Sequence, residues 1–241
     1  MFKNIIILQH IPIETPGYLL DLMEIDKFNL TTVELDKGEK IPQNLSNFDA
    51  MLCMGGPMDT WMEQQYPWLK EEKNKIKEFV INLKKPYLGF CLGCQLLGEV
   101  LGGRVIKSNP PEIGIFDVNM SNERYADRLF SEFPEKIKAL QWHSYEVIDL
   151  EVNHNVKILA STPTTKYQIF RYMDHAYGIQ FHIEIKNNTV NQWSCVPEYE
   201  RALEDSLGKG ALTEFDTIAK QNMQAMNKSA EILYKNFKEI I

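Results

Sequence analysis

A cysteine between two glycines is the arrangement in the sequence best suited to covalent chemistry. Segment 85–97 runs from an apolar stretch through Gly89, Cys91 and Gly93 into an apolar helical pattern. This order predicts a strand, a sharp turn and a helix, which is the nucleophile-elbow arrangement with cysteine in the place of serine. Glycines suit such a crowded turn, and the helix dipole favours the thiolate. Cys91 is therefore the predicted nucleophile.

A histidine and a glutamate near the end of a later apolar run are the predicted partners of this cysteine. An attacking thiolate needs a base that later protonates the leaving group, and a third group that orients the base. His182 follows the run 177–181, and Glu184 comes two residues later. Open α/β sheets carry their active sites beyond the carboxyl ends of strands, where Cys91 is also expected. The remaining histidines considered are expected at the surface or in loops: His10, His154 and His175.

Acyl transfer also needs backbone donors for the oxyanion of the tetrahedral intermediate. Segment 54–58, Met-Gly-Gly-Pro-Met, follows an apolar run and predicts a glycine-rich turn whose N–H groups face inward. Gly56 supplies one predicted donor, and the N–H of Leu92, next to Cys91, supplies the other. Glycine pairs after strands also form ordinary turns, so the prediction depends on both donors occurring together.

The spacing of Cys91 and Cys94 also fits redox and zinc motifs. Zinc would require a second pair of ligands, and neither Cys53 nor Cys195 belongs to one. A thioredoxin-like motif belongs near the first strand and helix of a small domain, whereas this one follows three predicted strands. Both alternatives are weaker than acyl transfer, and no metal site is predicted. Cys53 is interpreted as a buried packing residue.

The elements that must position these residues alternate in type. Short apolar runs alternate with amphipathic stretches in the first half, which predicts a parallel sheet with crossover helices. The expected strands there are 5–8, 32–35, 50–54 and 87–90, and the expected helices are 18–28, 68–83 and 95–101. Consecutive strands over 112–150, broken by 121–134, predict an antiparallel extension. The predicted fold is therefore α/β, with an open, mostly parallel sheet flanked by helices and extended by antiparallel strands.

The last part of the chain predicts a long helix. From Thr213 the apolar positions recur at three and four residues, as in an amphipathic helix, and Thr213 with Asp216 resembles a cap. We expect this helix to pack on its own domain, a surface for a partner protein being the alternative. No linker separates domains. Residues 1–190 are thus expected to form a catalytic core, and 191–241 a helical extension packed on the same domain.

Composition limits the classes of partner. Lysine and arginine number 26 against 33 aspartate and glutamate, for a net charge of −7, and no basic run suits a nucleic acid. No apolar stretch is long enough to predict a membrane span. Four cysteines are too sparse for a disulfide framework, and no export signal is visible. We therefore expect a cytoplasmic protein that binds neither nucleic acid nor membrane.

Together these motifs resemble the class I (triad) glutamine amidotransferases, in particular stand-alone proteins similar to the amidotransferase domain of GMP synthase. The resemblance rests on segments 10–17, 55–57, 89–95 and 181–184. It implies a flavodoxin-like fold, and it implies the following roles: Cys91 as nucleophile, His182 as acid and base, Glu184 as orienter, Gly56 and Leu92 as oxyanion hole, and Gln95, Ser144 and Tyr145 as substrate contacts. The family's His-Pro-Glu reads here with Ile183 in place of proline. We expect that change to tune the loop.

The implied reaction forms a γ-glutamyl thioester from glutamine and releases glutamate and ammonia, with no metal or organic cofactor. About fifty residues follow residue 190, too few for an ATP-dependent synthase domain, so ammonia is expected to pass to a separate synthase subunit. A homodimer is compatible with the resemblance. One alternative keeps the triad but hydrolyses a γ-glutamyl peptide or amide. Another is a non-catalytic or redox-sensing module, which the distal His-x-Glu pair argues against.

Overall fold

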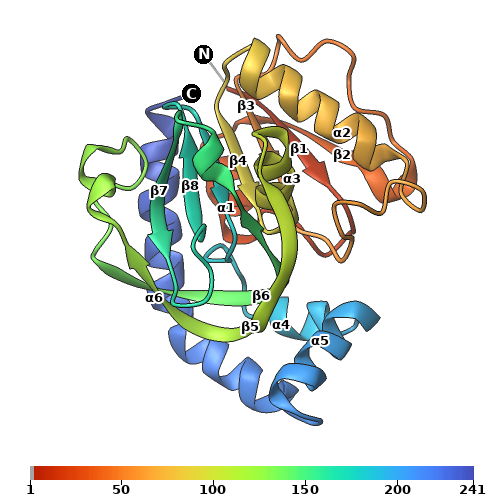
Figure 1. Cartoon of the computed structure of the whole chain (residues 1–241), viewed down its shortest axis with the longest axis vertical. Coiled ribbons are helices and arrows are strands. Elements are labelled where there is room, and N and C mark those ends of the chain that lie inside the picture. Colours follow the sequence, from red (N-terminus) through yellow and green to blue (C-terminus); the bar gives the residue numbers. More distant parts are fainter. Residues whose placement is uncertain (1–2) are drawn as a thin grey trace.

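The computed structural model describes residues 3–241, which form one nine-stranded sheet covered by helices on both faces (Figure 1). The strands are β1 (Asn4–Gln9), β2 (Asn29–Glu34), β3 (Ala50–Cys53), β4 (Tyr87–Phe90), β5 (Arg104–Met120), β6 (Lys136–Ile148), β7 (Val156–Ser161), β8 (Ile169–Tyr172) and β9 (Ala176–Ile179). Their order is β2-β1-β3-β4-β9-β8-β7-β5-β6. The first five strands in this order pair in parallel, and the pairs from β9 to β6 are antiparallel. The predicted α/β fold with an antiparallel extension is confirmed.

Helices cover the sheet in two layers, with α1 and α6 on one face and α2 and α3 on the other. The helices are α1 (Gly17–Ile25), α2 (Trp68–Lys77, continued by a π-helical turn at Glu78–Asn82), α3 (Leu92–Val100), α4 (Thr189–Trp193), α5 (Pro197–Leu207) and α6 (Leu212–Lys238). Strand β1 shows why its sequence is uniformly apolar. Ile5 and Ile7 pack toward α1 and α6, whereas Ile6 and Leu8 pack toward α2 and α3. None of the helices in residues 3–241 combines the length and apolar character needed to cross a bilayer.

The long helix α6 packs against the same sheet as the rest of the chain, with Phe215, Met226 and Leu233 buried in the core. It begins at Leu212, and Ala211 precedes it without a side-chain cap. The predicted cap at Thr213 is therefore wrong, because Thr213 already lies in the first turn. Two short helices that the sequence pattern did not indicate, α4 and α5, precede α6 and lie near β5 and β6 (Figure 1).

The strand order places the chemically interesting loops at one edge of the sheet. Strands β1, β3, β4 and β9 run parallel, so their carboxyl ends lie at the same edge. His10 follows β1, Gly55 follows β3, Cys91 follows β4 and His182 lies beyond β9. In open α/β sheets this edge, near the point where the strand order reverses, is where ligands bind.

Candidate active site

Cys91 occupies the sharp turn between β4 and α3. Its backbone has φ 49° and ψ −101°, in a region that side chains rarely adopt. A Cβ on Gly89 would lie 2.4 Å from the carbonyl oxygen of Gly93, and one on Gly93 would lie 2.2 Å from that of Cys53. Only glycine fits at either position, as the sequence predicted. The turn thereby holds the Cys91 side chain at the start of α3.

His182 reaches the same place from the neighbouring strand. Strands β4 and β9 are parallel neighbours, and the N–H of Cys91 donates to the carbonyl of Ile179 at 2.9 Å. Strand β9 ends there, two residues before the end of the predicted run. His182 then forms an isolated bridge with Leu140 of β6, with N···O distances of 2.9 and 3.0 Å. This bridge fixes the backbone that carries the imidazole.

The imidazole of His182 lies between Glu184 and Cys91. Its Nδ1 is 2.7 Å from Oε1 of Glu184, and the ring meets Trp193 edge-on with centroids 4.6 Å apart. Burial alone lowers the pKa of His182, but the Glu184 carboxylate and the hydrogen bond with Cys91 outweigh it and hold this pKa well above its ordinary value. The arrangement favours an imidazolium next to the sulfur, which is the state that donates a proton to a leaving group.

The backbone of Glu184 is fixed from the first helix. The N–H of Tyr18 donates to the carbonyl of Glu184 at 2.6 Å. Gly17, with φ +54°, makes this approach feasible, because a Cβ there would lie 2.1 Å from the same carbonyl oxygen. Part of segment 10–17 therefore serves to bring α1 against Glu184.

A cavity of about 400 Å³ opens beside Cys91. Among the predicted substrate and oxyanion residues, Gly56, Gln95, Ser144 and Tyr145 line it. Leu92 contacts Gly56, since a Cβ on that glycine would lie 3.1 Å from Cδ2 of Leu92. Within residues 3–241 the N–H groups of Gly56 and Leu92 donate to no other group of the chain. Two backbone donors are thus free next to the thiol.

Gln95 links the helix after Cys91 to strand β6. Its Nε2 donates to the carbonyl of Tyr145 at 3.1 Å and to Oε1 of Gln180 at 3.2 Å. The same Tyr145 carbonyl accepts a 2.9 Å hydrogen bond from Nδ1 of His143, whose Nε2 lies 3.1 Å from Oε2 of Glu112. Side chains from neighbouring strands and a helix therefore hold segment 143–145 at the cavity wall.

Two further residues next to the site were not predicted as site residues. The hydroxyl of Tyr199, on α5, donates to Oε1 of Glu14 at 2.6 Å, and both side chains are buried. Burial raises the pKa of Glu14, with nearby His182 opposing the rise. Tyr199 also lines the cavity beside Cys91. Glu14 belongs to the segment 10–17 that supported the family resemblance, whereas nothing in the pattern pointed to Tyr199.

The other cysteines have different surroundings. All four are free in the structure, and only Cys195 is exposed. Burial, together with nearby Cys91, raises the pKa of the Cys94 thiol well above its ordinary value, which disfavours a reactive thiolate. Cys53 is fully buried, as interpreted from the sequence. It contacts Glu72, and with His10 these residues form the group of metal-type donor side chains found within residues 3–241.

The expectation for His10 is wrong. Instead of lying at the surface, this side chain is fully buried between the Gly55 carbonyl and Glu72. Sequence pattern could not reveal this because Glu72 lies on α2, sixty-two residues away. A lone histidine after a strand does not indicate a partner on a helix that packs over it.

Comparisons with known proteins agree with this geometry. The protein-family model described as glutamine amidotransferase class-I matches residues 20–192. A glutamine amidotransferase-like protein of Salmonella typhimurium, YfeJ, is 26% identical over 223 residues, which cover 91% of this chain and 90% of the relative. One component of a glutamine-hydrolysing GMP synthase from Sulfolobus acidocaldarius is 34% identical over 150 residues, or 62% of this chain and 74% of the relative.

Solved structures show the same architecture over the whole chain. The crystal structure of a glutamine amidotransferase from Thermotoga maritima superposes with a TM-score of 0.86 at 26% identity, covering 99% of each chain. A glutamine amidotransferase structure from Methylobacillus flagellatus gives a TM-score of 0.84 at 21% identity, over 100% of this chain and 96% of that one. At that lower identity the second likeness concerns the fold.

Proposed function

Because the chain belongs to the class-I glutamine amidotransferase family, we propose that it hydrolyses the side-chain amide of glutamine through a thioester on Cys91. The observation that carries the proposal is the contact chain at the cavity. Cys91 stands on a positive-φ turn and hydrogen-bonds His182, which in turn lies 2.7 Å from Glu184. Nucleophile, base and orienting acid are the three parts that such acyl transfer requires.

In the first half-reaction the Cys91 sulfur attacks the δ-carbon of glutamine. The carbonyl oxygen becomes an oxyanion, for which the N–H groups of Gly56 and Leu92 are the proposed donors. The C–N bond then breaks, and His182 transfers its proton to the departing nitrogen. Ammonia leaves, and a γ-glutamyl thioester remains on Cys91.

In the second half-reaction water attacks the thioester. His182, now neutral, accepts a proton from that water, and the tetrahedral intermediate forms at the same two backbone donors. The C–S bond breaks, glutamate leaves, and the proton on His182 again faces the thiolate. Both half-reactions use only side chains and backbone of this chain, so the proposal calls for neither metal nor organic cofactor.

A γ-glutamyl peptide or amide is the second candidate substrate. The same thioester forms when an amine other than ammonia leaves. The observation that favours it is the extension of the cavity beyond Cys91 to charged side chains of α5, namely Glu198, Arg201 and Asp205. A leaving group larger than ammonia would find ionic contacts there.

The ammonia acceptor belongs to the proposal as well. One relative bears the name of a component of glutamine-hydrolysing GMP synthase. By analogy we propose that ammonia passes to a separate synthase subunit, and that the glutaminase works in the cytoplasm, alone or as a homodimer. Glutamine turnover that rises when such a partner is added would support this arrangement.

The deciding experiment compares substrates on one protein preparation. Glutamate and ammonia release from glutamine is measured beside amine release from γ-glutamyl dipeptides, for the unaltered protein, for Cys91→Ala and for the matched control Cys195→Ser. We expect turnover by the unaltered protein and Cys195→Ser, and none by Cys91→Ala. Full turnover in Cys91→Ala would overturn the nucleophile. Cleavage of the dipeptides without glutamine turnover would replace the first substrate by the second, and no turnover of either would favour a non-catalytic or redox-sensing module.

A further inference from the structure

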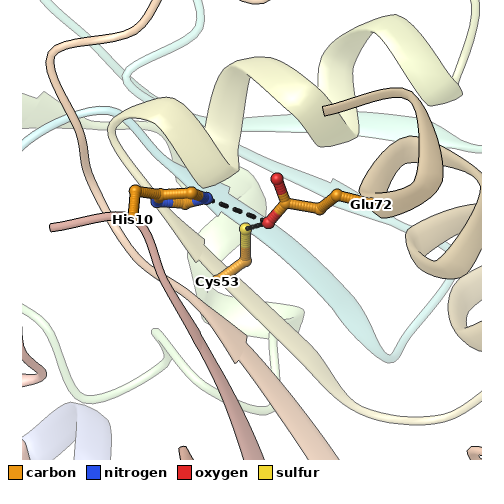
Figure 2. A group of neighbouring side chains, drawn as sticks. All are labelled: His10, Cys53 and Glu72. Carbon is orange, nitrogen blue, oxygen red and sulfur yellow. Dashed lines mark hydrogen bonds and ion pairs between the residues drawn. The ribbon is translucent and has the colours of Figure 1, made fainter. Parts of the chain in front are cut away.

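Three fully buried side chains from separate elements meet behind the Gly55–Gly56 turn (Figure 2). Nε2 of His10 lies 2.9 Å from Oε1 of Glu72, and the Cys53 thiol donates to the same oxygen at 3.2 Å. On its other side the His10 ring reaches the turn, because Nδ1 is 2.8 Å from the carbonyl oxygen of Gly55. The cluster therefore connects α2 to the loop at the cavity wall.

The bond to Gly55 has a fixed direction. A carbonyl oxygen only accepts, so Nδ1 of His10 must carry the proton. The Gly55 carbonyl and the Gly56 N–H belong to one planar trans peptide and point in opposite directions. Holding the carbonyl toward His10 therefore turns the Gly56 N–H away from His10, toward the cavity that Gly56 lines.

Packing holds the turn in this orientation. A Cβ on Gly56 would lie 2.9 Å from Cβ of His10, so the turn passes directly over the histidine. The ring itself is stacked on Trp68, with centroids 5.5 Å apart and planes 25° from parallel. With a ring face and both nitrogens in contact, the imidazole has little freedom to rotate.

The charge of Glu72 strengthens the contact. Burial alone lowers the pKa of His10, but the Glu72 carboxylate and the Gly55 carbonyl outweigh it and raise this pKa. A charged donor forms a stronger hydrogen bond than a neutral one and polarises the peptide it binds. The Gly56 N–H at the other end of that peptide becomes a better donor for an anion.

We infer that His10 and Glu72 are positioning residues, which orient and polarise the Gly55–Gly56 peptide so that its N–H binds the oxyanion formed at Cys91. The inference rests on the proposed function, because an oxyanion arises only if acyl transfer takes place. It gives a role to a buried ionisable pair that does not touch the substrate. A histidine that only filled the core would need no hydrogen bond to this particular carbonyl.

Two substitutions of His10 separate the bond to Gly55 from the rest of the cluster. The amide nitrogen of asparagine reaches the place of Nδ1, so His10→Asn keeps a donor for Gly55 and loses the contact with Glu72. The longer His10→Gln reaches the place of Nε2, so it keeps the contact with Glu72 and loses the one with Gly55. Cys53→Ala removes the thiol from the cluster and leaves both His10 contacts intact.

The assay measures kcat and KM for whichever substrate the unaltered protein hydrolyses. We expect His10→Gln to lower kcat about a hundredfold with KM nearly unchanged, as for the loss of one oxyanion donor. His10→Asn should retain most of the turnover, and Cys53→Ala nearly all of it. Thermal unfolding of the three variants separates these effects from lost stability, which a merely structural role would affect in both His10 variants alike.

Alkylation by iodoacetamide supplies a readout that needs no oxyanion. In a Cys195→Ser background, labelling of Cys91 should proceed at the same rate with His10 or with His10→Gln, because displacement of iodide develops no charge at Gly56. Equal kcat in His10→Gln and the unaltered protein would overturn the inference and leave the proposed function standing. So would a stoichiometric metal ion bound through His10, Cys53 and Glu72 in the purified protein. If the unaltered protein hydrolyses no γ-glutamyl substrate, the proposed function fails and the inference fails with it.

Discussion

The backbone N–H of Ile183 donates a 2.9 Å hydrogen bond to Oε2 of Glu184. The other carboxylate oxygen, Oε1, faces Nδ1 of His182 at 2.7 Å. Glu184 is therefore held by the residue that precedes it as well as by the imidazole it orients. Proline, the residue usual in the resembling family at this position, has no N–H to donate. In this chain isoleucine adds a hydrogen bond to the triad.

Replacing Ile183 tests that bond. Ile183→Pro removes the donor from a buried carboxylate, and we expect kcat to fall about tenfold, since a hydrogen bond to a charged group contributes about 1.5–3 kcal/mol. Ile183→Val is the matched control. It keeps the N–H and loses one buried methylene, so it should lower the free energy of unfolding by about 1 kcal/mol with little change in kcat. Equal turnover by the two variants would show that the bond is irrelevant to catalysis.

Glu184→Gln should lower kcat by about two to four orders of magnitude with KM near normal. The amide of glutamine can donate where the carboxylate accepts, which favours the wrong tautomer of His182 and removes the charge that stabilises the imidazolium. Steady-state kinetics on the substrate identified above measures the change. Glu14→Gln provides the comparison, because Glu14 is the other buried carboxylate close to His182 and bonds Tyr199 instead. A larger loss in Glu14→Gln than in Glu184→Gln would transfer the orienting role to Glu14.

The pKa of His182 should fall in Cys91→Ala. Burial lowers this pKa, while Glu184 and the hydrogen bond with Cys91 raise it, with a net rise. Removing the sulfur deletes one of the raising contacts, so the imidazolium loses its proton at a lower pH than in the unaltered protein. Titration of isotopically labelled histidine by NMR measures the shift. Cys94→Ala should leave this pKa in place, and an unchanged or higher pKa in Cys91→Ala would contradict the proposed contact.

Local pattern predicted the parts of the site that depend on short-range geometry. The glycines around Cys91 and the strand before them follow from steric demands within a few residues, and the structure reproduces both. His182 and Cys91 were expected together because parallel strands end at one edge of a sheet, although the pairing of β4 with β9 itself is not written in either segment. The misplaced residue, His10, depends on which helix covers it, and its partner Glu72 has no distinguishing local pattern.

Glu112 should make the stability of the fold sensitive to acid. It is almost fully buried, and burial raises its pKa, but hydrogen bonds from His143, Thr162 and Thr164 outweigh this and lower the pKa from 4.5 to about 2. The folded state thus holds the ionised form more strongly than the unfolded state does. The resulting stability is present above pH 4.5 and is lost as pH falls toward 2. At 1.36 kcal/mol per pH unit this shift corresponds to about 3 kcal/mol.

Glu112→Gln should therefore lower the free energy of unfolding by about 3 kcal/mol at pH 7, and by much less at pH 3. Urea unfolding of both proteins across this pH range measures the difference. Asp117→Asn is the matched control, because Asp117 is an exposed carboxylate paired with Lys138 on the same antiparallel part of the sheet. Such exposed pairs contribute about 1 kcal/mol or less, so this control should change little with pH. A loss of the same size at pH 3 and pH 7 in Glu112→Gln would mean that packing, rather than the ionised carboxylate, accounts for it. Because the His143 bonded to Glu112 also holds the Tyr145 carbonyl, KM should rise in the same variant as the cavity wall loosens.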